Sequence, residues 1–277
     1  MNFTLLAENP LFMATGVLYA GAFAAYAAIW RSRKALLGLL ATALMLAALS
    51  GNLGLIVARW IAADRPPFKS LYESMVFLAL NCAMVYLVME LLLRTRVFGA
   101  LAALGCLGAM IFAVTKWDAE IVKLPPALQS GWFVPHVMVY FVGYAALFLA
   151  TVVSVVQLFK PRLTVNAGTA LRGDLVLEDV AYKTIRFGFV LLTFGLLVGS
   201  IWAKAAWGDF WVWDPKENWS LVTWLVYAAY LHLRHIKGWR GNKAAWLSIA
   251  GFAVVMFTYL GMELLPTAAE SAHVYQG

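Results

Sequence analysis

Four histidines and a tryptophan-rich segment are the residues of this chain whose types suggest chemistry. The histidines are His136, His232, His235 and His273. The segment from Ser200 to Trp224 reads SIWAKAAWGDFWVWDPKENWSLVTW and holds six of the chain's twelve tryptophans. An interfacial aromatic belt accounts for two or three of them but not for a dense run interleaved with glycine, proline and acidic residues. The segment therefore predicts a stacking platform for a large, flat, apolar ligand.

A porphyrin fits such a platform, because it is planar and hydrophobic with two carboxylates at one edge. Gly208 lets the backbone approach the ligand closely, and Pro215 stiffens the loop just after Asp214. Lys204 and Lys216 could pair with the two carboxylates. Their alternative partners are the neighbouring acidic residues and lipid phosphate.

The bulk composition is that of a membrane protein. Of the 277 residues, 63% are hydrophobic and 13% are charged, whereas soluble domains are roughly half apolar and a quarter charged. The candidate spans lie at 10–30, 36–58, 72–92, 97–115, 132–159, 185–206, 220–236 and 244–262. We therefore predict an all-α fold, a polytopic integral membrane helix bundle with about eight transmembrane helices. It forms one membrane domain over residues 1–277, in which Cys82 and Cys106 are small core residues.

Charge predicts the sidedness of the bundle. With the N-terminus outside, alternate loops collect 14 basic and four acidic residues on one side, and seven basic and ten acidic residues on the other. Because cytoplasmic loops carry the excess of Lys and Arg, we expect the basic side in the cytoplasm and both termini outside. The loops 59–72, 116–131 and 207–219 and the tail 263–277 then share the outer face. The same asymmetry accounts for the net charge of +7, so this charge does not indicate a nucleic-acid partner.

The predicted topology places two histidines beside the tryptophan-rich loop. Haem iron takes axial ligands, most often histidine, and both His136, within GWFVPHVMVY, and His273, within ESAHVYQG, fall on the outer face. His232 lies within the seventh span, 12 residues from Ser220, or roughly 18 Å along a helix. It is a candidate deeper ligand, because an ionisable residue at that depth is costly; the alternative is a hydrogen-bonded structural histidine. His235 is interpreted as a cytoplasmic loop residue.

Three stretches of the chain resemble a known family. The run WGDFWVWDPKENWSLVTWLVYAAYLHLR (207–234) resembles the tryptophan-rich WWD signature of haem-handling proteins in cytochrome c maturation. RPPFKSLYESMVFLAL (65–80) resembles the P-x-x-S-x-Y-E-S segment of one of them, the integral haem-binding subunit of the two-component (system II) cytochrome c synthase. LPPALQSGWFVPHVMVYFVGYAAL (124–147) resembles its P-A-L-Q-S…H-V segment, so the resemblance spans most of residues 60–277.

The resemblance implies roles for particular positions. His136 and His273 match the outer histidines that ligate haem iron, and His232 matches the membrane-embedded one. The signature itself corresponds to Trp207, Gly208, Trp211, Trp213, Asp214 and Glu217. The tail departs from the family, since it reads S-A-H-V-Y where G-L-H-S-Y is usual. No second deep histidine is present, which implies that a partner subunit with a large outer domain supplies it.

The function implied is haem delivery within a cytochrome c haem-lyase (synthase) complex. Haem b would lie on the outer loop between His136 and His273, facing an apocytochrome c whose reduced C-x-x-C-H thiols form thioethers with it. The chain would supply orientation and proximity, with Asp214 and Glu217 ordering the loop or orienting a histidine, and no residue is assigned a catalytic role. A separate thiol-reducing pathway and membrane lipid are the other partners expected, in a plasma (inner) membrane with the active face on the periplasmic or outer side.

Three other functions remain open at this point. One is a haem exporter or chaperone of the same family without ligation activity. Another is a redox protein that keeps a haem for electron transfer, although such proteins bury pairs of helical histidines. The last is a structural assembly subunit without cofactor, which leaves the tryptophan-rich loop unexplained.

Overall fold

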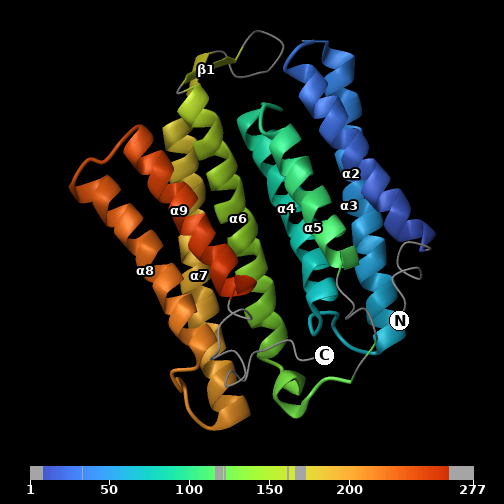
Figure 1. Ribbon diagram of the computed structural model, residues 1–277, viewed down its shortest axis with the longest axis vertical. Coiled ribbons are helices and arrows are strands. Elements are labelled where there is room, and N and C mark those ends of the chain that lie inside the picture. Colours follow the sequence, from blue (N-terminus) through green and yellow to red (C-terminus); the bar gives the residue numbers. More distant parts are fainter. Residues whose placement is uncertain are drawn as a thin grey trace. The chain divides into compact units, whose positions relative to one another are not determined.

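The structure, a computed structural model, describes residues 9–32, 34–115, 121, 123–160, 162–165 and 173–261. Over these residues it contains eight α-helices (Figure 1). Their bounds are α2 Pro10–Ile29, α3 Ala35–Ala63, α4 Leu71–Leu93, α5 Gly99–Thr115, α6 Phe133–Phe159, α7 Leu177–Trp207, α8 Pro215–Ile236 and α9 Asn242–Tyr259. A 3-10 helix, η1 Pro126–Gln129, precedes α6, and strand β1 Arg162–Val165 pairs with β2 Gly173–Val176. The predicted all-α class is confirmed, since each predicted span overlaps one helix.

Five of the helices are long and apolar enough to cross a membrane, namely α2, α3, α4, α6 and α7. Helix α5 is apolar but has only 17 residues. Helices α8 and α9 fall outside this group, because α8 carries polar residues at both ends and α9 begins with Asn242 and Lys243. The polytopic membrane bundle is therefore supported, and crossing by the three shorter or more polar helices stays a prediction.

Helices α2 to α5 form one compact unit. Helix α3 packs against α2 and α4, and α5 packs against α4 and α2, so the four helices close a ring. A buried carboxylate joins three of them: Glu90 of α4 accepts hydrogen bonds from Tyr26 of α2 at 2.6 Å and from Thr42 of α3 at 2.5 Å. Tyr86 and Arg96 complete the set at 2.7 and 3.1 Å. The cluster fixes these helices at one end of the unit.

Helices α6 to α9, with η1, belong to a second compact unit. Helix α6 packs against α7 and α9, and α8 packs against α9 and α7. Glycines allow the close approach of α6 and α7: a Cβ built on Gly188 would lie 2.8 Å from Cδ2 of Leu147. Gly208, at φ 92°, ends α7 in the left-handed region that suits glycine. The loop 208–214 follows directly and leads into α8.

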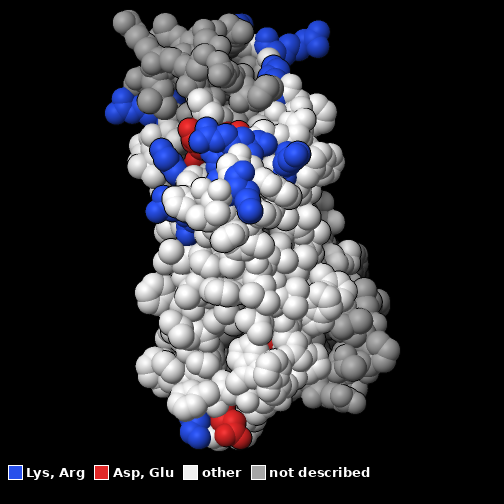
Figure 2. Space-filling view, turned by 90° about the vertical axis from the view of Figure 1, so that its left-hand side faces the viewer, with Lys and Arg blue, Asp and Glu red and all other residues white. Residues whose placement is uncertain are grey.

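Charged residues gather at the opposite end of this second unit. Arg234 of α8 pairs with Glu178 and Asp179 in the first turn of α7, and the Gly241 amide donates to Glu178 at 2.8 Å. Around this cluster the exposed cations are Lys183, Arg186, Lys237, Arg240 and Lys243. Figure 2 shows Lys and Arg crowded near the top of the face that carries α8 and α9, with an uncharged band below them. This distribution is typical of a helix bundle in a bilayer.

Candidate functional site

His136 lies in the first turn of α6, and its side chain contacts α7. Its Nδ1 lies 2.9 Å from the carbonyl oxygen of Gly195. Because a carbonyl only accepts, Nδ1 must carry the proton, and in the neutral ring Nε2 then holds the lone pair. Histidines that bind metals commonly donate their other ring N–H in this way. The contact therefore favours the tautomer whose lone pair is on Nε2, the form of histidine that can bind a metal ion.

A wall of aromatic rings backs the imidazole. Trp202 of α7 is 3% exposed, and its ring centroid lies 5.5 Å from that of His136. The same indole packs on Phe133 at 5.4 Å and on Trp207 at 4.9 Å. Its Nε1 donates to the carbonyl of Ala127 in η1 at 2.9 Å. Thus η1, the start of α6 and the end of α7 together fix the surroundings of His136.

The loop 208–214 is held by its own acidic residues. Asp214 caps α8 and accepts from the Lys216 amide at 2.8 Å, while Glu217 accepts from the amides of Val212 and Asp214 at 2.9 and 3.1 Å. This reciprocal arrangement is a capping box. Both carboxylates are buried. Of the two roles expected for these acids, ordering the loop is therefore the one that their contacts support.

The loop presents apolar surface outward. Phe210, Val212 and Trp213 are 57%, 45% and 69% exposed. Trp211 packs edge-on to Trp213 at 6.0 Å, and its Nε1 is buried with no hydrogen-bond partner among the described residues. Lys204 lies beside this surface, where its ammonium contacts the Gly208 carbonyl and lies 5.5 Å from the centre of the Phe210 ring. The loop therefore offers flat aromatic faces, the unpaired N–H donor of Trp211 and the nearby positive charge of Lys204.

Not every tryptophan of the 200–224 segment belongs to this surface. Trp219 packs on Phe257 of α9 at 4.4 Å. Trp224 donates to Thr193 of α7 at 2.9 Å and packs on Phe189 at 5.2 Å. These two residues join α8 to its neighbours, so the exposed platform is narrower than the sequence segment.

The remaining histidines lie elsewhere. His232 is in α8, 17 residues beyond Pro215, which is roughly 25 Å along the helix axis from the loop. It is exposed on a face of α8 that also carries Val222, Leu225, Ala229 and Ile236, and His235 lies near the charged end of the same helix. His232 therefore lies far along α8 from the loop 208–214. His273 lies outside the described residues.

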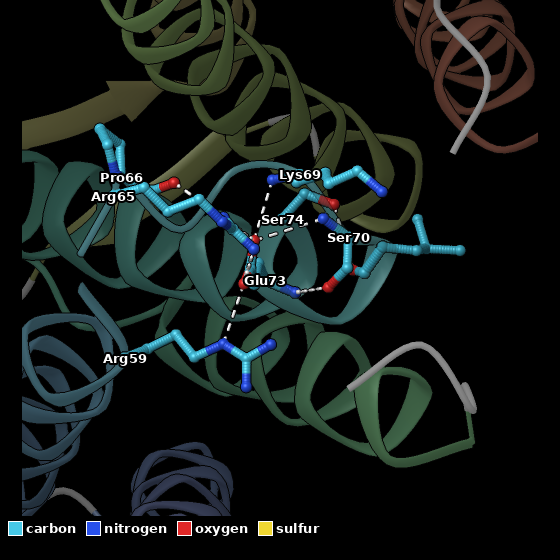
Figure 3. A network of polar contacts seen from close by, with 8 residues as sticks. Arg59, Arg65, Pro66, Lys69, Ser70, Glu73 and Ser74 are labelled. Carbon is cyan, nitrogen blue, oxygen red and sulfur yellow. Dashed lines mark hydrogen bonds and ion pairs between the residues drawn. The ribbon is translucent and has the colours of Figure 1, made fainter. Parts of the chain in front are cut away.

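A polar network occupies the start of α4 (Figure 3), and the resemblance of the segment 65–80 implied no role for its charged residues. Glu73 is 2% exposed and accepts from Arg59 at 2.9 Å and from Arg65 at 2.9 and 3.0 Å. It also accepts from the backbone amides of Lys69 and Ser70. The spacing S-x-x-E of Ser70 and Glu73, which is the pattern of a capping box, was the signal available in the sequence.

Comparisons with known proteins agree with this architecture. Residues 68–269 match the family described as cytochrome C assembly protein. The cytochrome c biogenesis protein CcsA of Synechococcus sp. (strain CC9311) is 37% identical over 244 residues, covering 76% of this chain and 80% of that protein. The CcsA of Chlamydomonas reinhardtii is 40% identical over 230 residues, covering 80% of this chain and 64% of that protein. The solved cytochrome c heme lyase CcmF shares the fold, with a TM-score of 0.66 at 16% identity over 98% of this chain and 52% of its own. The chain therefore belongs to the cytochrome c assembly protein family.

Proposed function

We propose that this chain holds haem b against the loop 208–214 and presents it for covalent attachment to apocytochrome c. Its family places the chain in cytochrome c biogenesis. The observation that carries the proposal is the hydrogen bond from Nδ1 of His136 to the Gly195 carbonyl, which leaves Nε2 as the ligand nitrogen.

The residues around His136 suit a porphyrin. Trp202 and Trp207 form an aromatic wall beside the imidazole, and Trp211 and Trp213 add ring faces from the loop. The buried, unpaired Nε1–H of Trp211 can donate to a carboxylate. Lys204 supplies a positive charge beside the ring of Phe210 in the same loop. His273 would give the second axial ligand from the tail.

The chemistry of attachment requires little of the chain beyond positioning. Each cysteine thiol of the C-x-x-C-H motif adds across a vinyl group, with sulfur bonding to one carbon and the hydrogen going to the other. No oxidant or reductant is consumed, provided that the thiols arrive reduced from a separate pathway. His136 and the capped loop would hold the haem, and with it the vinyl groups, in one orientation toward the thiols. This contribution is a proximity effect.

A partner subunit would complete the second, deeper site. His232 is exposed on a mainly apolar face of α8, and a histidine in such a position calls for a polar or metal partner. We propose that a synthase subunit with a large outer domain docks on this face and contributes the second histidine. The apolar neighbours of His232 at helical spacing suit a membrane helix.

The test is the absorption spectrum of the chain purified in detergent with its partner and ample haem. A low-spin haem signal is expected in the wild type, with most of the outer-site signal lost in His136→Ala and in His273→Ala. His235→Ala is the matched control, because it removes an exposed histidine from the other end of α8. A colourless wild type, or variants at 136 and 273 that match the control, would overturn the proposal. Thioether formation on a co-expressed cytochrome separates attachment from haem export.

A further inference from the structure

Two glycines one turn apart on α7 face the ring of His136. Gly195 and Gly199 are four residues apart, so they lie on the same side of the helix. A Cβ built on Gly199 would lie 2.6 Å from Cε1 and 2.7 Å from Nδ1 of His136. Real Cβ atoms do not approach other atoms so closely, so any side chain at position 199 must displace the imidazole.

The second glycine supplies the acceptor and admits a second ring. The carbonyl of Gly195 takes the Nδ1–H of His136 at 2.9 Å. In a regular helix this carbonyl also accepts the amide of Gly199, and its second lone pair is available to the imidazole. A Cβ on Gly195 would lie 2.6 Å from the ring of Tyr140, and that ring meets His136 edge-on at 4.9 Å.

Two aromatic rings and the backbone of α7 thus surround the imidazole. Tyr140 lies on one side, Trp202 lies 5.5 Å away on another, and the bare backbone of Gly199 forms the floor. The Gly195 carbonyl sets which nitrogen carries the proton. A flexible histidine at a membrane surface would need none of these contacts, whereas a ligand that must present one nitrogen in one direction needs all of them.

We infer that Gly199, together with the Gly195 carbonyl, is a positioning element for His136, which sets the ring plane and makes Nε2 the ligand nitrogen. This inference rests on the proposed haem-holding function. Gly199 acts through His136 and touches no substrate itself. Its role is to leave room for the ring against α7 at the point where the acceptor carbonyl is within reach.

The test compares Gly199→Ala with Gly188→Ala in the full chain, purified with its partner and haem. Gly188 is a matched control, because it packs on α6 equally tightly but its added Cβ would meet Leu147 at 2.8 Å instead of His136. In Gly199→Ala we expect haem retention to fall by about tenfold or more, the range found when groups supporting a metal ligand are lost. The low-spin bands of the remaining haem are expected to shift or convert to high-spin. Gly188→Ala should keep the wild-type spectrum.

Each outcome separates this inference from the proposed function. A wild type without haem would overturn the proposed function itself. A wild-type signal that depends on His136 but is unchanged in Gly199→Ala would overturn only the positioning role. Equal loss in both glycine variants would also overturn it, by showing that α6–α7 packing is the cause. If Gly199→Ala does not accumulate, Tyr140→Leu removes one side of the enclosure without adding atoms, and an unchanged spectrum there would contradict the inference equally.

Discussion

The indole N–H of Trp211 is a buried donor that finds no acceptor in the part of the chain that the structure describes. Its neighbour Trp213 has φ 60° and is 69% exposed, a backbone conformation that non-glycine residues seldom adopt. Both features cost stability, since unpaired buried donors and left-handed backbone are each unfavourable. Costs of this kind gather where a surface is kept ready for a ligand.

Trp211→Phe tests whether this N–H serves the ligand. The substitution keeps an aromatic face and removes a donor that makes no hydrogen bond to any residue that the structure describes, so the thermal unfolding midpoint should stay the same or rise slightly. The affinity for haem should fall by about tenfold or more, because a hydrogen bond to a charged group contributes about 1.5–3 kcal/mol, and the haem-to-protein ratio of the purified complex reports the loss. Trp219→Phe is the control, since Trp219 packs on Phe257 away from the loop. An unchanged ratio in Trp211→Phe would show that the N–H is not used.

At this scale the sequence predicts features that depend on neighbouring residues, but not contacts between residues that are far apart in the chain. His136 was predicted as a site residue because it opens a span next to the predicted outer loop. Its acceptor, Gly195, is 59 residues away, and the register between two packed helices cannot be read from either one alone. The predicted loop 207–219 contained Asp214 and Glu217, but in the structure Asp214 is the N-cap of α8 and Glu217 lies in its first turn, and their hydrogen bonds to backbone amides appear only in the folded chain.

At the scale of elements, the end of α7 and the start of α8 determine the shape of the loop. Gly208 terminates α7, and Asp214, Pro215 and Glu217 start α8. Proline at the first helical position and a capping box between Asp214 and Glu217 are strong start signals. This explains why α8 begins at Pro215 and not at residue 220, where the hydrophobic pattern begins.

Asp214→Ala should loosen the loop through loss of this cap. The cost expected is about 1 kcal/mol, the typical value for an N-cap side chain. Asp214→Asn keeps an oxygen that can accept from the Lys216 amide and should retain most of the stability. Limited proteolysis within 208–214 measures the effect, with faster cleavage expected in the alanine variant only. Equal cleavage of both variants would mean that the charge, and not the cap, holds the loop.

The connection between α3 and α4 depends on a single carboxylate. Glu73 receives two arginine side chains and two backbone amides, and its own side chain is fully buried. Removing one partner of a buried ion pair leaves the other charge uncompensated and costs about 3–5 kcal/mol. Figure 3 shows that Arg59 and Arg65 approach Glu73 from different segments, so the loss would release both.

Glu73→Gln should therefore lower the thermal midpoint and the yield of the chain markedly, without altering the spectrum of any haem that remains bound. Arg65→Lys is the milder partner variant, because it keeps the charge but cannot form two parallel bonds. Thermal unfolding in detergent, followed by near-ultraviolet circular dichroism, measures both. A stable Glu73→Gln chain with altered haem bands would instead assign Glu73 to the ligand site.

At the scale of the whole chain, composition and charge spacing predicted more than any single motif. A continuous run of apolar residues specifies a membrane helix because the backbone must satisfy its own hydrogen bonds in lipid. Five helices meet that criterion clearly. Helix α8 is not among them, since its charged and polar ends support a capped loop at one end and the Arg234 cluster at the other. The division into two four-helix units follows from packing and was not visible in the sequence.

The predicted sidedness can be decided by labelling single cysteines with a membrane-impermeant thiol reagent in intact cells. Native Cys82 and Cys106 are both buried, so the parent chain should give little background. Lys123 precedes η1 and is exposed, whereas Lys237 follows α8 among the basic residues and is also exposed. If basic loops face the cytoplasm, Lys123→Cys should react in intact cells and Lys237→Cys only after the membrane is permeabilised. Reaction of both in intact cells would mean that α8 does not cross the bilayer, and His232 would then have to serve on the same face as His136.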